Sequence, residues 1–220
     1  MKLLIIDSNN GAKTLINSIK TIKDIDYKLV KLPNSELISV TKISLRELIL
    51  KLLTNNLTHK YDKYDVCIIM CVSASSSILD ILIKNNFIIA NVFIIEPLIP
   101  ICLYIKEHKF KTLLILSTQI TQKIRWISRL LNNPTFNINY ASLNLSENQM
   151  TNITKISEAI NKLIKYKSFV ANCDCIVLGC SSYSVIKNII AKELKSKYNF
   201  NGLLLDSSII TFKYFSNHLL

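Results

Sequence analysis

Short apolar runs rich in Ile, Val and Leu alternate with longer amphipathic stretches along almost the whole sequence. A continuous aliphatic run predicts a strand buried on both faces, and apolar residues three and four positions apart predict a helix. The predicted strands cover residues 2–7, 27–31, 65–70, 92–95, 112–117, 138–142, 175–178 and 202–205. The predicted helices cover residues 44–57, 75–83, 121–131, 153–165 and 184–194. Strands that alternate with crossover helices form a parallel sheet, so the expected fold class is α/β.

Polar residues follow many of these strands at the point where each strand ends. Hydroxyl and acidic groups are frequent directly after the strands that begin at residues 2, 65, 112, 175 and 202. These segments include Asp7-Ser8, Cys71-Val72-Ser73, Ser117-Thr118, Cys180-Ser181 and Asp206-Ser207. In parallel α/β sheets, the loops at the carboxyl ends of the strands meet helix N-termini and form the binding sites. We therefore expect the functional site at these strand ends.

Neither a nucleotide cofactor nor a metal ion is expected. Glycine occurs only at positions 11, 179 and 202, so the phosphate-binding patterns GxGxxG and GxxxxGK[ST] are both missing from the sequence. A zinc site is the alternative use of the cysteines. However, the pairs Cys67/Cys71 and Cys173/Cys175 lack the CxxC spacing, and no histidine is near them in the sequence. The sequence thus indicates a site made of side chains alone.

The sequence has six cysteines, and its N-terminus has no secretion signal that would favour a disulfide framework. Four of them, Cys67, Cys102, Cys173 and Cys175, lie inside or beside apolar runs. A free cysteine in such a run behaves as a small buried hydrophobic residue. We expect these four to pack in the core.

The other two cysteines, Cys71 and Cys180, occupy equivalent places in the two halves of the chain. Each directly follows an apolar strand, and each precedes small hydroxyl residues that can begin a helix. A helix N-terminus favours the thiolate, so we expect the pKa of both thiols to lie below the usual value of about 8.5. Two such thiols on opposite sides of one bound carbon could remove a proton from one face and return a proton to the other. The alternative for both positions is plain core packing.

The formal net charge of +12 raises the question of a nucleic-acid partner. The lysines are scattered through every segment, only Arg46, Arg125 and Arg129 are arginines, and no basic stripe interleaved with aromatic residues is present to stack bases. The charge therefore indicates a solvated surface, and we expect no specific nucleic-acid partner.

The longest apolar stretch, at residues 87–105, is interrupted by Asn91, Glu96, Pro97 and Pro100. Carrying these residues through a bilayer would be costly, so we expect neither a transmembrane helix nor a membrane partner. The N-terminal apolar run is too short for a signal-peptide core, which predicts a cytoplasmic protein. The sequence does not fix the oligomeric state, and a homodimer is left open.

At the two cysteines the sequence resembles glutamate racemase. The family's Asp-Ser-Gly-x-Gly-Gly is similar to residues 7–12, its Ala-Cys-Asn-Thr-Ala-Ser to residues 70–75, and its Leu-Gly-Cys-Thr-His-Tyr-Pro to residues 178–184. Further similarities, in chain order, are Glu96-Pro97, the threonine pair Thr118 and Thr121, the segment 143–147 that ends in Glu147, and Asp206-Ser207. The motifs extend colinearly over nearly the whole chain.

This resemblance implies a cofactor-free fold of two pseudo-symmetric α/β lobes with the active site in the cleft between them. The first lobe would comprise residues 1–98 and 206–220, and the second residues 99–205. The implied activity is the interconversion of L- and D-glutamate, which in bacteria supplies D-glutamate for peptidoglycan. The resemblance implies that Cys71 and Cys180 are the proton donor and acceptor. It also implies that Asp7 assists Cys71 and contacts the substrate ammonium group. The residues implied to bind the small amino-acid substrate are Ser8, Ser73, Thr118, Thr121 and Ser181.

The sequence departs from the family at several motif positions. Val72 replaces the asparagine after the first cysteine, and Ser182 replaces the histidine two positions beyond the second. Residues 33–35 and 39–41 stand in place of the Gly-Asp-Thr and Pro-Tyr-Gly elements. Two alternatives to an active glutamate racemase therefore stay open: a binding protein that keeps the fold without catalysis, and a related enzyme that acts on aspartate or another acid with an activated α-carbon.

Overall fold

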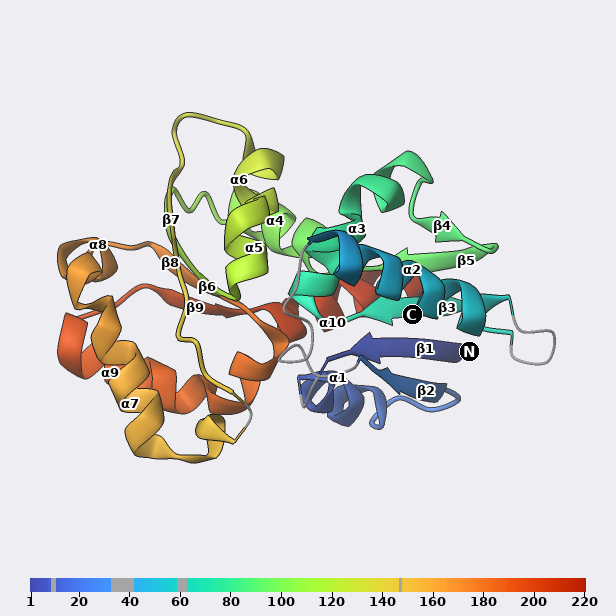
Figure 1. Ribbon diagram of the computed structural model, residues 1–220, viewed down its shortest axis with the longest axis horizontal. Coiled ribbons are helices and arrows are strands. Elements are labelled where there is room, and N and C mark those ends of the chain that lie inside the picture. Colours follow the sequence, from blue (N-terminus) through green and yellow to red (C-terminus); the bar gives the residue numbers. More distant parts are fainter. Residues whose placement is uncertain (9–10, 33–41, 59–62, 147) are drawn as a thin grey trace.

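The computed structural model describes residues 1–8, 11–32, 42–58, 63–146 and 148–220, and the strands of this part of the chain form two sheets (Figure 1). The strands of the first sheet are β1 (Lys2–Asp7), β2 (Asp26–Lys31), β3 (Val66–Ile69), β4 (Ile88–Ile89) and β5 (Val92–Ile95). They lie in the order β2-β1-β3-β5-β4, and every pairing is parallel except that of β4 with β5. The aliphatic residues 3–6 of the interior strand β1 are fully buried, as expected for a strand covered on both faces.

The second sheet has four parallel strands: β6 (Thr112–Ser117), β7 (Asn137–Ala141), β8 (Cys175–Gly179) and β9 (Leu203–Asp206). Their order is β7-β6-β8-β9. Figure 1 shows the two sheets in separate halves of the molecule, each flanked by its own helices. The predicted α/β class, with two mostly parallel sheets, is confirmed.

The helices that precede β6 along the chain are α1 (Ala12–Ile19), α2 (Lys42–Leu57), α3 (Val72–Lys84) and α4 (Leu98–Glu107). Those that follow β6 are α5 (Gln119–Ile124), α6 (Trp126–Leu131), α7 (Ile153–Asn161), α8 (Lys167–Ala171), α9 (Lys187–Tyr198) and α10 (Ser207–Leu219). Short 3-10 helices are η1 (Gln149–Thr151), η2 (Lys162–Tyr166) and η3 (Ser181–Ile186). No sequence pattern predicted four of these helices, α1, α4, α8 and α10, or the two-residue strand β4.

The prediction of one continuous helix over residues 121–131 is wrong. Arg125 has a left-handed backbone conformation with φ of 55°, which ends α5 and lets α6 begin in a new direction. The Trp126 indole N–H donates a 2.9 Å hydrogen bond to the Ser76 carbonyl, and this contact holds the start of α6 against α3. The predicted helix over residues 153–165 likewise ends early, because the α-helix stops at Asn161 and continues as η2.

The chain passes from the first sheet to the second after β5 and returns after β9. Helix α4 packs in the second half, where Leu98 and Ile101 share a core with Leu113 of β6. Helix α10 returns to the first half, where Phe215 packs against Leu3 of β1. This packing supports the predicted division at residues 98 and 206, which remains a prediction.

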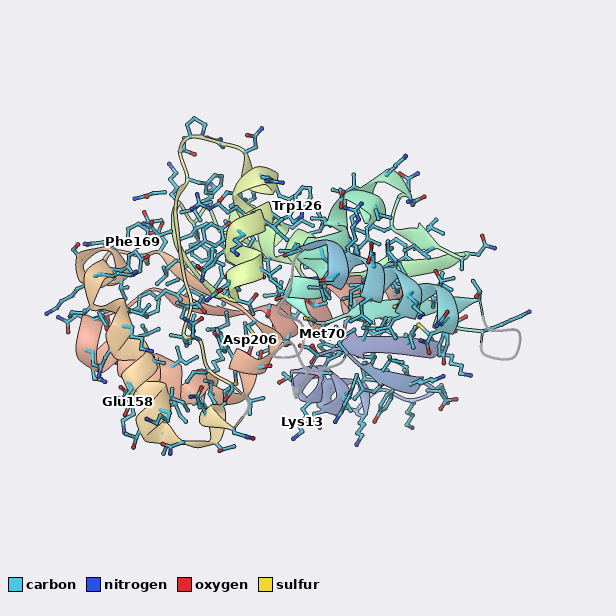
Figure 2. All side chains as sticks on the ribbon, in the orientation of Figure 1. Lys13, Met70, Trp126, Glu158, Phe169 and Asp206 are labelled. Carbon is cyan, nitrogen blue, oxygen red and sulfur yellow. The ribbon has the colours of Figure 1, made fainter. Side chains whose placement is uncertain are left out.

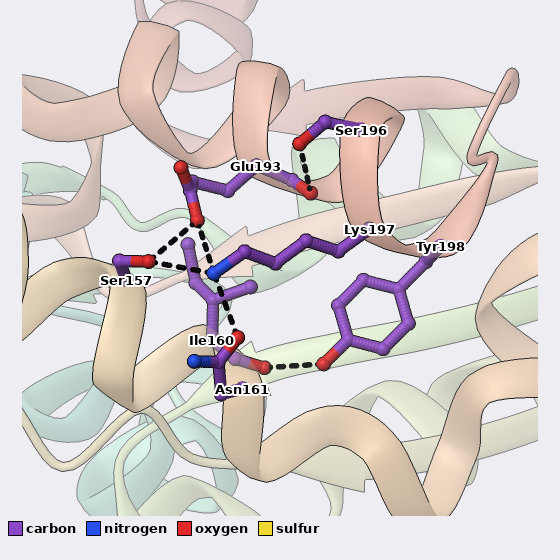
Figure 3. Close-up of polar contacts among 7 residues, drawn as sticks. All are labelled: Ser157, Ile160, Asn161, Glu193, Ser196, Lys197 and Tyr198. Carbon is purple, nitrogen blue, oxygen red and sulfur yellow. Dashed lines mark hydrogen bonds and ion pairs between the residues drawn. The ribbon is translucent and has the colours of Figure 1, made fainter.

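A polar network on the outer side of the second half shows how one of the lysines is used (Figure 3). Lys197 of α9 donates to Ser157 at 2.6 Å and to Asn161 at 2.7 Å, and it forms a 2.6 Å ion pair with Glu193. The Tyr198 hydroxyl donates to the Ile160 carbonyl at 2.7 Å. These bonds join α9 to α7, so this lysine has a structural role.

Two further sequence predictions concern burial. Cys67, Cys102, Cys173 and Cys175 are all at most 5% exposed, which confirms that they pack in the core. No helix in the described ranges is both long and apolar enough to span a membrane.

Candidate active site

The carboxyl ends of strands from both sheets meet at the centre of the molecule. Figure 2 shows Met70, which follows β3, and Asp206, which ends β9, in this central region, whereas Lys13, Glu158 and Phe169 lie toward the outside. The strand-end residues also begin helices. Cys71 is the N-cap of α3, Thr118 is the N-cap of α5 and Cys180 is the N-cap of η3. The backbone amides of three helix N-termini therefore lie next to these strand ends, an arrangement that favours an anionic ligand.

A hydrogen bond between the two halves joins Asp7 to Ser181. The Ser181 hydroxyl donates to Asp7 Oδ1 at 2.8 Å, and the Ala12 amide donates to Asp7 Oδ2 at 2.6 Å. Both Asp7 and Ser181 are at most 1% exposed. The Asp7 carboxylate thus connects the start of α1 with the start of η3.

Gly11 makes this close approach possible. A Cβ atom added at Gly11 would lie 2.2 Å from the Ser181 Cβ and 2.5 Å from the Ser181 carbonyl carbon. No side chain fits at such distances unless the two halves separate. Glycine at position 11 is therefore required by the packing of η3 against the start of α1, since its φ of −62° would suit any residue.

Three hydroxyl groups form a second connection between the halves. Ser73 Oγ, at the start of α3, shares a 2.7 Å hydrogen bond with Thr118 Oγ1 and lies 3.4 Å from Thr121 Oγ1. Thr118 Oγ1 also accepts from the Thr121 amide at 3.4 Å, which caps α5. These predicted substrate-binding hydroxyls satisfy one another here, and a bound carboxylate could replace some of these bonds.

The two candidate thiols lie in one electrostatic environment. Burial, the charge of Cys71 and the charge of Asp7 together raise the pKa of Cys180 to about 12. Burial and the Asp7 charge also raise the pKa of Cys71, which is 8% exposed. The prediction that helix N-termini would lower both pKa values is wrong, because the loss of water around the sulfur atoms outweighs the amides. Without a ligand, both thiols are protonated at neutral pH.

Each thiol nevertheless has hydrogen-bonding groups that favour its charged form. The Ser8 hydroxyl and the amides of Ser73 and Ala74 lower the pKa of Cys71. The amide and the hydroxyl of Ser182 lower the pKa of Cys180. Ser182, which the sequence analysis treated only as a lost histidine, therefore contacts the second thiol and was missed as a site residue.

The other departure from the family motif lies in the core. Val72 is 1% exposed and packs with Leu98 and Leu205, so its side chain contributes to the apolar contact between the halves. The replaced elements at residues 33–35 and 39–41, and Glu147, lie outside the described residues. Within the described residues, no cluster of His, Cys, Asp and Glu side chains is arranged to hold a metal ion.

Two buried acids at the crossings between the sheets were noted in the sequence but given no role. Glu96 is 2% exposed and accepts hydrogen bonds from the amides of Leu98 and Ile99, both at 2.7 Å. Burial raises the pKa of Glu96 to about 7. Asp206 is 3% exposed and caps α10. The signal that could have identified both is an acid placed directly after an apolar strand and before a helix.

The sequence matches no protein-family model and no curated protein. The structure, however, resembles solved racemase structures over its whole length. A glutamate racemase from Bacillus anthracis gives a TM-score of 0.77 at 15% identity, covering 99% of this chain and 80% of that one. The glutamate racemase of Francisella tularensis in complex with D-glutamate gives a TM-score of 0.75 at 17% identity, covering 99% of this chain and 80% of that one. An aspartate racemase from Picrophilus torridus gives a TM-score of 0.65 at 15% identity, covering 98% of this chain and 93% of that one. The chain has the fold of these racemases.

Proposed function

We propose that this protein is a cofactor-independent amino-acid racemase that interconverts L- and D-glutamate with Cys71 and Cys180 as its two proton-transfer groups. The observation that carries the proposal is the electrostatic coupling of two thiols that follow strands of different sheets. The charge of Cys71 raises the pKa of Cys180, which supports the assignment of both thiols to one site. In a bacterium, the product would supply D-glutamate for peptidoglycan.

The proposed chemistry needs one thiolate and one thiol. The thiolate removes the α-proton of the bound amino acid, and the electron pair of the broken C–H bond spreads into the α-carboxylate. The opposite thiol then donates its proton to the other face of the carbon and becomes the thiolate. One proton has been accepted and one donated, so no cofactor or co-reactant is consumed, and the α-carbon is inverted.

Asp7 has two roles in this proposal. Its carboxylate, buried beside both thiols, can accept hydrogen bonds from the substrate ammonium group. Its negative charge also raises the pKa of both thiols in the absence of substrate. A bound ammonium group would offset that charge and so favour the formation of one thiolate. The active form of the site would therefore develop only with substrate bound.

The proposed substrate is a small amino acid with two carboxylates. The hydroxyls of Ser8, Ser73, Thr118, Thr121 and Ser181 are the groups proposed to bind it. The amides at the starts of α3, α5 and η3 add donors for negative charge. Glutamate is favoured over aspartate because the glutamate racemase in complex with D-glutamate has a higher TM-score to this chain than the aspartate racemase has.

The test is a racemisation assay with L-glutamate, D-glutamate and both aspartate enantiomers, followed by circular dichroism. Cys71→Ala and Cys180→Ala should each abolish racemisation, whereas Cys102→Ala, which removes a buried thiol outside the site, should retain it. Parent-like racemisation by both site variants would refute the proposal. Binding of glutamate in a calorimeter without turnover by the parent protein would instead identify a binding protein.

A further inference from the structure

The Asp206 carboxylate occupies the point where the chain leaves the second sheet. It ends β9, is 3% exposed, and accepts hydrogen bonds from the Ser208 amide at 2.9 Å and the Ile209 amide at 3.4 Å. These two bonds cap α10. This capping role explains why an acid occupies the position. The carboxylate oxygens can also accept hydrogen bonds from further donors.

A third donor reaches the same oxygen from η3. The Ser184 hydroxyl donates to Asp206 Oδ1 at 2.6 Å, and Ser184 Oγ also lies 3.0 Å from the Ser208 hydroxyl. Ser184 is in the 3-10 helix that begins at Ser181, directly after Cys180. The register of the sheet accounts for the contact, because Leu178 of β8 pairs with Asp206 of β9.

The turn that follows Cys180 depends on such contacts. A 3-10 helix has weaker hydrogen-bond geometry than an α-helix, so a six-residue example gains its order from tertiary bonds. Its first residue, Ser181, is held by Asp7 of the first half, and Ser184 is held by Asp206. Between these two attachments lies Ser182, whose amide and hydroxyl contact the Cys180 thiol.

We propose that Asp206, acting through the Ser184 hydroxyl, is a positioning residue that fixes η3 and thereby holds the Cys180 sulfur in place. The contribution to turnover rests on the proposed racemase function, whereas the contribution to the environment of Cys180 does not. Without the Ser184 bond, η3 loses one of its hydrogen-bonded attachments, and we expect water to reach the sulfur atom. Because burial is the main reason for the low acidity of Cys180, this thiol then ionises more readily.

The experiment compares Ser184→Ala with Ser184→Thr, which keeps the hydroxyl, in the full-length protein. Ser216→Ala is the matched control, because it removes another part-buried serine hydroxyl, one that donates to the Phe212 carbonyl within α10. Alkylation by iodoacetamide is followed over a pH series, and peptide mass spectrometry separates Cys180 from Cys71. Thermal unfolding is recorded for every variant.

In Ser184→Ala, we expect alkylation of Cys180 to become several-fold faster, with its pH profile moved to lower pH, and alkylation of Cys71 to stay near the parent rate. Ser184→Thr should restore the parent profile. If glutamate is racemised, kcat of Ser184→Ala should fall about tenfold or more with a smaller change in KM. An unchanged Cys180 profile in Ser184→Ala, or an equal change in Ser216→Ala, would overturn the inference. A parent protein without racemase activity would refute only the proposed function, because the alkylation result stands by itself.

Discussion

The Ser181 hydroxyl and the Asp7 carboxylate form a 2.8 Å hydrogen bond although they lie 174 positions apart in the sequence. The bond joins the end of β1 in the first sheet to the turn that follows β8 in the second. Because the same carboxylate raises the pKa of both Cys71 and Cys180, it couples the contact between the halves to the acidity of the candidate catalytic thiols.

Asp7→Asn should lower the pKa of both thiols, because a neutral amide no longer opposes the negative charge of a thiolate. The pH dependence of thiol alkylation, resolved by peptide mass spectrometry, measures both values. Asp65→Asn is the control, since Asp65 accepts a hydrogen bond from the Lys2 backbone amide and lies at the other end of the strands, away from the thiols. Racemisation by Asp7→Asn should fall despite the more acidic thiols, because the contact with the substrate ammonium is weakened. Thiol pKa values equal to those of the parent would contradict the assigned electrostatics.

Ser8→Ala and Ser182→Ala should act on different thiols. Removal of the Ser8 hydroxyl should raise the pKa of Cys71 alone, and removal of the Ser182 hydroxyl should raise the pKa of Cys180 alone, because each hydroxyl stabilises the neighbouring thiolate. Each variant serves as the control for the other in the same alkylation assay. Equal effects of either variant on both thiols would show that these hydrogen bonds are assigned wrongly.

Gly11→Ala should destabilise the protein and reduce its activity, because the new Cβ would lie 2.2 Å from the Ser181 Cβ. The expected loss in the free energy of unfolding is about 1–3 kcal/mol, measured by urea denaturation. Gly179→Ala is the matched control, since its Cβ would come no closer than 3.1 Å to a neighbouring atom, Ser117 Cβ. If Gly11→Ala lowers the free energy of unfolding by no more than Gly179→Ala does, the two halves are not closely packed at this point.

Glu96 should make stability depend on pH. Its pKa is about 7 in the folded protein and about 4.5 when unperturbed, so the folded state binds the proton more tightly. The stabilisation by protonated Glu96 is fully present below pH 4.5 and is lost as the pH rises through 7, with a total on the order of 3 kcal/mol. Urea denaturation across this range should show the parent losing stability relative to Glu96→Gln. A constant difference between the two proteins would exclude this shift.

Elements that a local sequence pattern determines were predictable from the sequence alone. Strand β1 was predicted with its observed bounds, Lys2–Asp7, because a continuous aliphatic run of this length is too short for a typical helix and favours a buried strand. Helix α4 was missed because its apolar run contains Pro100, although proline is tolerated in the first turn of a helix. The break at Arg125 depends on packing, since Trp126 bonds to Ser76, which is distant in the sequence.

The candidate site was only partly predictable for a similar reason. The equivalence of Cys71 and Cys180 followed from the rule that parallel strands present functional groups at their carboxyl ends. The direction of the thiol pKa shifts could not be predicted in the same way. A helix N-terminus is a local feature of the sequence, whereas the burial of the thiols depends on both halves together. The Ser184–Asp206 and Ser181–Asp7 bonds likewise arise only when strands distant in sequence are placed side by side.

The central claim is that the two thiols act on opposite faces of one α-carbon, and deuterium exchange into each glutamate enantiomer in heavy water tests it most directly. Each single-thiol variant can remove and return a proton on one face only. Cys71→Ala and Cys180→Ala should therefore label opposite enantiomers at the α-carbon, without inversion, as measured by NMR. Labelling of the same enantiomer by both variants, or inversion at the parent rate by either one, would contradict the claim.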